Sequence, residues 1–441
     1  MKEKNRASFA YLRKLEGRGI RLGLERMGKA IKLIKLKKML VVKVAGTNGK
    51  GSCACLLARI FENAGYKTGL YLSPHIVDFG ERIQIDGEYI SEAELCTRIL
   101  ELKEILEKNS VELSYFEFLT LLALKYFSDK KCEAIVLEVG LGGRLDATNV
   151  LQAKYSAITS VSVEHKQILG STTRKIAREK AGIIDKNTKI FTAVENKSAL
   201  AEIKKICMEK NAELFNYGKD FFCNKQQMQM HKMNFDFKAN AKKADFEDLE
   251  NLKIALVGKR QFASAAIAIA IAQQIGLSEK AIRTGLKEAE MAGRFDIRRK
   301  NPLLIFDNAH NPEAIKNLAD TIKQLFGNKK IILVFGVSSD KEYQKMLKEI
   351  LQIPKKVYIT QAKYRGLDMK ILGKEIKKIL GKNKIKKTGK KDGIGLILER
   401  NVKLAVKRAQ KEAEKDDIVL FCGSCFVFWE ALANKNVRHS N

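Results

Sequence analysis

The sequence has no long apolar run and lacks the high cysteine content of disulfide-rich proteins. Eight cysteines in 441 residues are too few for a disulfide scaffold. No stretch approaches the roughly 18 uninterrupted apolar residues of a membrane span, and the N-terminus lacks the apolar core and cleavage site of a secretory signal. These absences exclude a small disulfide-rich module and predict a cytoplasmic protein with reduced thiols and no membrane role.

A single Cys-x-x-Cys pair is present, formed by Cys422 and Cys425. It has neither a second pair nor a neighbouring histidine to complete a zinc site. We therefore interpret both cysteines as core or turn residues.

Positive charge dominates: 82 Lys+Arg against 51 Asp+Glu give a formal net charge of +31. Such a surplus attracts polyanions, including nucleic acid. However, the lysines are spread along the chain, and their clusters at 35–38, 374–378 and 382–391 lack the interleaved aromatic residues of a stacking site. We interpret the surplus as a solvated surface and disfavour nucleic acid as a partner.

The chain length and its apolar pattern indicate an α/β protein. A chain of 441 residues is long enough for two or three domains. From residue 41 onward, short β-branched runs alternate with helical patterns, which is typical of a mainly parallel sheet. The expected strands include 41–45, 134–138, 157–159, 303–306, 331–335, 357–360 and 418–421, and a hairpin is expected at 226–239.

A domain boundary is predicted near residue 296. The segment 286–300 carries Gly293 and a basic cluster, and Pro302 precedes a new strand. We expect a larger P-loop domain over 1–296 and a smaller Rossmann-like α/β domain over 297–441.

A glycine-rich loop lies between a predicted strand and a predicted helix, which is the geometry that cradles phosphate. Lys50 would reach the outer phosphates. The loop is not a regular Walker A sequence, because Gly51 separates Lys50 from Ser52 and because Val44 stands where the first glycine is expected. The predicted nucleotide-binding residues are Gly46, Thr47, Asn48, Gly49, Lys50, Gly51 and Ser52.

This loop resembles that of the folylpolyglutamate synthase and dihydrofolate synthase family, within the Mur-type amide ligases. Further blocks resemble the family in the same order along nearly the whole chain, at 72–75, 81–83, 116–118, 138–149, 169–172, 176–183, 293–295, 307–312 and 423–424. The resemblance implies ATP-dependent ligation of L-glutamate to folate or dihydropteroate through an acyl phosphate. Because anionic groups meet in such a reaction, cations and backbone dipoles must neutralise them.

The resemblance also implies two Mg²⁺ sites. Ser52 and Glu138 are hard oxygen donors of the kind Mg²⁺ prefers, whereas His165, placed by the resemblance at the second ion, is a less typical ligand.

Lys180 permits two interpretations. Its helical context alone indicates a surface ion pair with Glu179, but in Mur-type ligases the lysine of this block is carbamylated by CO₂ and helps to hold the second metal ion. Carbamylation needs a neutral amine and hence a lowered pKa.

In the second half, the resemblance implies that Arg294 binds phosphate and Asp307 a ribose hydroxyl. His310 would face the acyl phosphate or the incoming glutamate and join Lys50 and Lys180 in catalysis, although it also precedes Pro312 at a predicted helix start. Gln261 belongs to a block that contacts the nucleotide in the family, and it is retained here. In the same block, Arg260 and Ser264 replace the family's histidine and asparagine. Elsewhere, Lys43 replaces another histidine that is usual in the family.

The loop with Ser73, Pro74, His75 and Arg82 resembles the family's pterin-binding region. Arg82 could pair with a substrate carboxylate or with Glu81. Two other functions remain open: a Mur-type ligase acting on another carboxylated compound, and a nucleic-acid-associated P-loop ATPase. The sequence does not separate dihydrofolate synthase from folylpolyglutamate synthase activity, and we expect a monomer.

Overall fold

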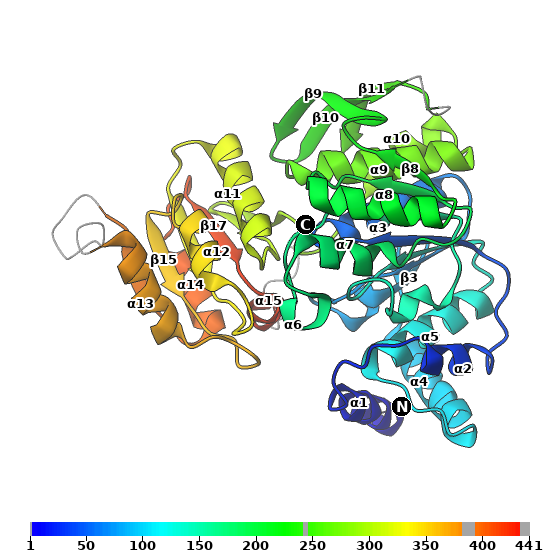
Figure 1. The fold of residues 1–441 in the computed structure, drawn as a ribbon. Coiled ribbons are helices and arrows are strands. Elements are labelled where there is room, and N and C mark those ends of the chain that lie inside the picture. Colours follow the sequence, from blue (N-terminus) through cyan, green and yellow to red (C-terminus); the bar gives the residue numbers. More distant parts are fainter. Residues whose placement is uncertain (1, 241–245, 382–392, 433–441) are drawn as a thin grey trace. The chain divides into compact units, whose positions relative to one another are not determined.

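The computed structural model describes residues 2–240, 246–381 and 393–432 (Figure 1). The chain divides into two compact units: 1–227, 233–255 and 260–290 form the first, and 228–232, 256–259 and 291–441 form the second. The lysine cluster predicted at 382–391 lies outside the described residues. Among the described helices, none is long and apolar enough to cross a membrane.

The first unit is built on an eight-stranded sheet with the order β4-β3-β2-β5-β1-β6-β7-β8. The six strands from β2 to β8 in that order are parallel, and β3 and β4 are antiparallel at one edge. Strand β1 therefore lies between β5 and β6. The strands are β1 (Leu40–Ala45), β2 (Thr68–Tyr71), β3 (Ile83–Ile85), β4 (Glu88–Tyr89), β5 (Ala134–Glu138), β6 (Tyr155–Ile158), β7 (Lys189–Thr192) and β8 (Glu213–Asn216).

Helices cover this sheet, as expected for parallel strands that read as nearly continuous apolar runs. Helices α1, α2, α4 and α5 share an apolar cluster with β1, β2 and β5, and α3 packs against α9 and α10. The helices are α1 (Lys2–Glu16), α2 (Glu25–Ile31), α3 (Lys50–Asn63), α4 (Glu92–Lys108), α5 (Tyr115–Asp129), α6 (Lys166–Leu169), α7 (Thr173–Ala181), α8 (Lys197–Glu209), α9 (Arg260–Ile275) and α10 (Glu279–Glu288), with short 3-10 turns η1 (Phe79–Arg82) and η2 (Ala147–Val150).

The predicted hairpin is confirmed and is larger than expected. Strands β9 (Phe221–Gln229) and β10 (Lys232–Ala239) are joined by β11 (Leu249–Ile254) in a three-stranded sheet. Strand β11 was not predicted, because only Leu249, Leu252 and Ile254 are buried in it.

The second unit contains a six-stranded sheet with the order β12-β13-β17-β14-β15-β16, parallel except for β12. Helices α11, α12 and α13 share one apolar cluster with the central strands, and α14 and α15 contact β14, β15 and β17. The predicted α/β architecture is thereby confirmed. The elements are β12 (Asp296–Lys300), β13 (Leu303–Phe306), α11 (Pro312–Phe326), β14 (Ile331–Phe335), α12 (Tyr343–Ile350), β15 (Lys356–Ile359), α13 (Met369–Leu380), β16 (Gly395–Leu398), α14 (Val402–Glu412), β17 (Ile418–Cys422) and α15 (Cys425–Leu432).

A fully buried lysine lies in the central strand β1. Lys43 Nζ donates to Asn149 Oδ1 at 2.8 Å, to the Leu151 carbonyl at 3.1 Å and to Asp185 Oδ2 at 2.7 Å. Three acceptors match the three protons of an ammonium group. Burial lowers the pKa of Lys43, and the hydrogen bond with Asp185 opposes that shift. The contacts tie β1 to η2, to the residue that follows it and to the segment after α7.

We expect Lys43→Met to destabilise the first unit by about 2–4 kcal/mol, because Asp185 loses its cation and keeps the Ala153 N–H, while two further acceptors lose the ammonium donor. Urea unfolding followed by circular dichroism measures the change, with the exposed Lys38→Met as the matched control. Equal midpoints for the two variants would show that the buried ion pair contributes nothing.

Candidate active site

The predicted phosphate loop joins β1 to α3, as expected. Gly46 and Gly49 have φ angles of 150° and 88°, and Gly49 is the N-cap residue of α3. A Cβ atom added to Gly46 would lie 2.0 Å from Thr159 Oγ1. Only glycine fits there, and backbone N–H groups at the start of a 14-residue helix favour an anion.

The segment that follows β6 holds the loop in place. The Thr47 N–H donates to the Ser160 carbonyl at 2.9 Å, and the Asn48 N–H donates to Ser160 Oγ at 2.9 Å. Thr159 Oγ1 in turn donates to the Asn48 carbonyl at 2.8 Å. Sequence reasoning missed these residues, although hydroxyl side chains directly after a buried parallel strand were a usable signal.

Lys50 and Ser52 begin helix α3. Lys50 Nζ donates to the Gly46 carbonyl at 3.0 Å and to the Thr47 carbonyl at 3.3 Å, so the ammonium group lies over its own loop. Ser52 is 1% exposed. Both side chains therefore belong to the loop that would receive phosphate.

Glu138 ends strand β5 beside the loop strand, and its register partner is Val44 of β1. The carboxylate is buried and accepts the Ser73 N–H at 2.8 Å. Two blocks that are far apart in the sequence, the loop after β2 and the end of β5, thus meet at the carboxyl edge of the sheet.

Lys180 is buried in helix α7, so the interpretation as a surface residue is wrong. Its Nζ donates to Glu164 Oε1 at 3.0 Å, while Glu179, the predicted partner, pairs instead with Arg144. Burial lowers the pKa of Lys180 to about 8. The charge of Lys50 acts in the same direction, and Glu164 opposes the shift. Burial raises the pKa of Glu164, but Lys180 and Lys50 outweigh it and bring the value to about 2.

His165 occupies an exposed position next to this pair. It precedes the short helix α6 in a left-handed conformation, with φ at 45°. Its charge acts on Glu164 and lowers the pKa of that carboxyl. The predicted role of His165 as a metal ligand stays a prediction.

Asp146 organises the glycine-rich loop that follows β5. Its carboxylate accepts the Leu141 N–H at 2.8 Å and both the N–H and the hydroxyl of Thr148, at 3.1 and 2.6 Å. Burial raises the pKa of Asp146, and these hydrogen bonds oppose the shift. In the sequence, Asp146 belongs to the family block 138–149, but no role was predicted for it.

In the predicted pterin loop, Arg82 pairs with His75 rather than with Glu81. Arg82 Nε donates to His75 Nδ1 at 2.7 Å, so a neutral His75 carries its proton on Nε2. The Glu81 carboxylate instead accepts the N–H groups of Ile76, Val77 and Asp78. The alternative Arg82–Glu81 pair is therefore wrong, while Ser73 and Pro74 lie in the same loop, ahead of η1.

The pKa of His75 is lowered from 6.5 to about 4, first by burial and then by Arg82. Because the unfolded chain binds this proton more readily, the neutral imidazole stabilises the fold above about pH 6.5. We expect that contribution, about 3 kcal/mol at most, to be lost as the pH falls from 6.5 towards 4. NMR titration should show that the His75 imidazole is not protonated at pH 6. Arg82→Met should raise the pKa of His75. Titration of His75 near its ordinary pKa in the unaltered protein would contradict this prediction.

Helix α9 begins beside the phosphate loop. The Cβ position of Gly49 lies 3.2 Å from Ser264 Oγ and 3.8 Å from Arg260 Cδ, so both residues that depart from the family pattern line the loop. Gln261 is buried, and its Oε1 has no hydrogen-bond partner in the described part of the chain.

The remaining predicted residues lie in the second unit: Arg294 precedes strand β12, and Asp307 and His310 follow strand β13. Asp307 accepts the Phe295 N–H at 2.9 Å and the Ala309 N–H at 2.8 Å, and burial raises its pKa while Arg294 opposes the shift. His310 Nδ1 contacts the Asn308 carbonyl at 2.8 Å. His310 also precedes the N-cap of α11, so its position fits the structural alternative as well as the catalytic one.

Comparison with known families agrees with this geometry. The Mur ligase middle domain matches residues 44–272, and the Mur ligase glutamate ligase domain matches residues 293–425. Together these matches span both the phosphate loop and the second sheet.

The individual relatives include dihydrofolate synthase/folylpolyglutamate synthases from several bacteria. The dihydrofolate synthase/folylpolyglutamate synthase of Bacillus subtilis is 35% identical over 347 residues, covering 75% of this chain and 79% of the relative. FolC of E. coli in complex with DHPP and ADP has a TM-score of 0.84 at 30% identity and 98% coverage of both chains. The Yersinia pestis bifunctional enzyme with AMPPNP and Mn has a TM-score of 0.83 at 30% identity and 97% coverage of both chains. The chain belongs to the folylpolyglutamate synthase/dihydrofolate synthase family of ATP-dependent Mur-type ligases.

Proposed function

We propose that this chain ligates L-glutamate to the carboxylate of dihydropteroate or of a reduced folate. A carboxylate oxygen attacks the γ-phosphorus of ATP and ADP leaves, which gives an acyl phosphate. The glutamate amine then attacks the acyl carbon, loses a proton and expels phosphate. One amide bond forms for each ATP consumed.

The observation that carries this proposal is the convergence of the phosphate loop, Glu138 and the buried Lys180–Glu164 pair at one edge of the sheet. The N–H groups at the start of α3 and the Lys50 ammonium group supply positive charge for the β- and γ-phosphates. Lys50 already lies over the loop, 3.0 Å from the Gly46 carbonyl.

The donor set fits Mg²⁺ bound together with a nucleotide. The described residues hold no group of three or more His, Cys, Asp or Glu side chains able to bind a metal ion by themselves. Mg²⁺ in such sites takes one or two protein oxygens, with phosphate and water completing the shell. Ser52 and Glu138 supply hard oxygens, and the bound ion would neutralise charge on the transferring phosphoryl group.

Carbamylation of Lys180 is part of the proposal. Addition of the neutral amine to CO₂, with loss of a proton, would turn a buried cation into an anion. A pKa of about 8 leaves a usable neutral fraction near physiological pH. Carbon-13 NMR of protein equilibrated with ¹³CO₂ should show a carbamate signal that Lys180→Met abolishes; free amine alone in the metal-loaded enzyme would contradict this step.

Phosphate release with MgATP and L-glutamate tests the function. Dihydropteroate, tetrahydrofolate and single-stranded DNA or RNA are offered in parallel, and products are identified by mass spectrometry. A glutamyl adduct on either pterin is the expected result and identifies the preferred acceptor. Phosphate release only with nucleic acid, or with neither pterin, would overturn the proposal. The cytoplasmic location and monomeric state remain predictions.

A further inference from the structure

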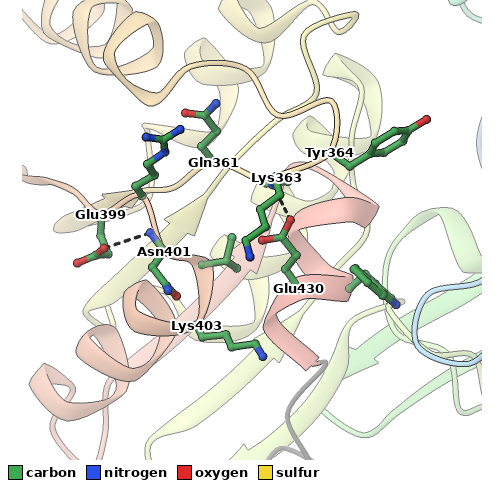
Figure 2. A pocket seen from close by; sticks show the side chains of 11 residues that line it. Gln361, Lys363, Tyr364, Glu399, Asn401, Lys403 and Glu430 are labelled. Atoms are coloured by element: carbon green, nitrogen blue, oxygen red, sulfur yellow. Dashed lines mark hydrogen bonds between the residues drawn. The ribbon is translucent and has the colours of Figure 1, made fainter.

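A cavity of about 860 Å³ lies within the second unit, and none of the residues predicted for the ligase site lines it (Figure 2). It opens where β15 and β16 end, between the segments 361–364 and 399–403, and α15 contributes Trp429 and Glu430. The carboxyl edge of a parallel sheet is the usual place for a ligand in an α/β fold. The volume is in the range of small-molecule sites.

Two of the three cations that line this cavity, Lys363 and Arg400, are available, whereas its carboxylates are already engaged. Glu399 pairs with Arg408 at 2.8 Å. The dashed lines in Figure 2 show that Glu399 also accepts the Asn401 N–H and that Glu430 accepts the Lys363 N–H. The side chains of Lys363 and Arg400 make no hydrogen bond or ion pair with any residue that the structure describes.

Two exposed aromatic side chains accompany these cations. Trp429, the single tryptophan of the chain, is 52% exposed, and Tyr364 is 59% exposed. Tyr364 is held edge-on by Phe426, with ring centroids 5.0 Å apart. Aromatic faces beside unpaired cations provide a stacking surface next to an anion-binding surface.

We propose that this cavity is a second binding site for an anionic ligand that carries a flat heteroaromatic ring. The ring stacks on Trp429, and the anionic groups contact Arg400 and Lys363. Two compounds in the proposed reaction have this chemistry, namely the adenine nucleotide and a pterin with a chain of glutamate carboxylates. The choice between these two sources rests on the proposed function, but the site itself does not.

Fluorescence of Trp429 tests the proposal, because no other tryptophan contributes to the signal. The full-length protein is titrated with ADP and, separately, with folyltriglutamate, without L-glutamate, so no ligation occurs. We expect one of the probes to change the emission, and the double variant Lys363→Ala/Arg400→Ala to weaken that binding at least about 10-fold. Turnover at saturating substrate should stay within about two-fold of the unaltered enzyme.

The matched control is Lys407→Ala, an exposed lysine on helix α14 that lies outside the cavity. A response to ADP alone assigns the site to the nucleotide, and a response to folyltriglutamate that the double variant abolishes assigns it to the pterin. No response to either probe, or a response that survives in the double variant, overturns the proposal. If the protein shows no ligase activity but still shows the Trp429 response, the proposed function is wrong and the proposed second site is supported.

Discussion

Replacing Lys180 with methionine should lower kcat by about three orders of magnitude or more. The substitution removes the amine that would become the buried carbamate, and it leaves Glu164 without the partner now 3.0 Å away. The loss should therefore appear in turnover more than in ATP binding. Steady-state kinetics at saturating MgATP measure the effect.

The matched control is Lys175→Met, an exposed lysine in the same helix, which should leave kcat within about two-fold. Removing dissolved CO₂ should lower the activity of the unaltered enzyme, and bicarbonate should restore it, while Lys180→Met responds to neither. A Lys180→Met enzyme within ten-fold of normal activity, or an unaltered enzyme indifferent to CO₂, would refute the role given to this residue.

Replacing Lys50 with methionine should lower kcat/KM for ATP by about 100- to 10,000-fold. Lys50 is the cation that the fold holds over the phosphate loop, by hydrogen bonds to Gly46 and Thr47. Its removal also takes a positive charge away from Glu164 and Lys180, so the pKa of Lys180 should rise.

The exposed Lys67→Met, in the same unit, serves as the control and should leave kcat/KM near normal. ATP dependence of phosphate release gives the constants for both variants. Unchanged kcat/KM in Lys50→Met would mean that the loop does not bind the transferring phosphates.

Much of this fold could be predicted from the sequence, because buried parallel strands read as continuous apolar runs. Strands β5, β13 and β14 have the predicted limits. Strand β16 was missed because it is a four-residue edge strand that begins with glycine. Its apolar run, 396–398, is too short for its periodicity to separate a strand from part of a helix.

The residues of the phosphate loop could be predicted because a sequence motif specifies its backbone. The environment of Lys180 and the partner of Arg82 were harder to predict, because they depend on burial and on tertiary contacts. Of the two interpretations of Lys180, its charged neighbours alone favoured the surface ion pair, although Lys180 shares a helix face with the buried Ile176 and Ala177. That spacing already placed it towards the core. By contrast, the pairing of Arg82 with His75 depends on how η1 turns the loop, which no periodic pattern in the sequence records.

The transfer of ¹⁸O from the substrate carboxylate to phosphate tests the proposed acyl phosphate intermediate most directly. Dihydropteroate or tetrahydrofolate labelled with ¹⁸O in its free carboxylate is incubated with MgATP and L-glutamate, and the released phosphate is analysed by mass spectrometry. An acyl phosphate intermediate transfers one carboxylate oxygen to phosphate, so we predict one ¹⁸O in each phosphate for every amide formed. Phosphate free of ¹⁸O while a glutamyl product accumulates would contradict the proposed chemistry.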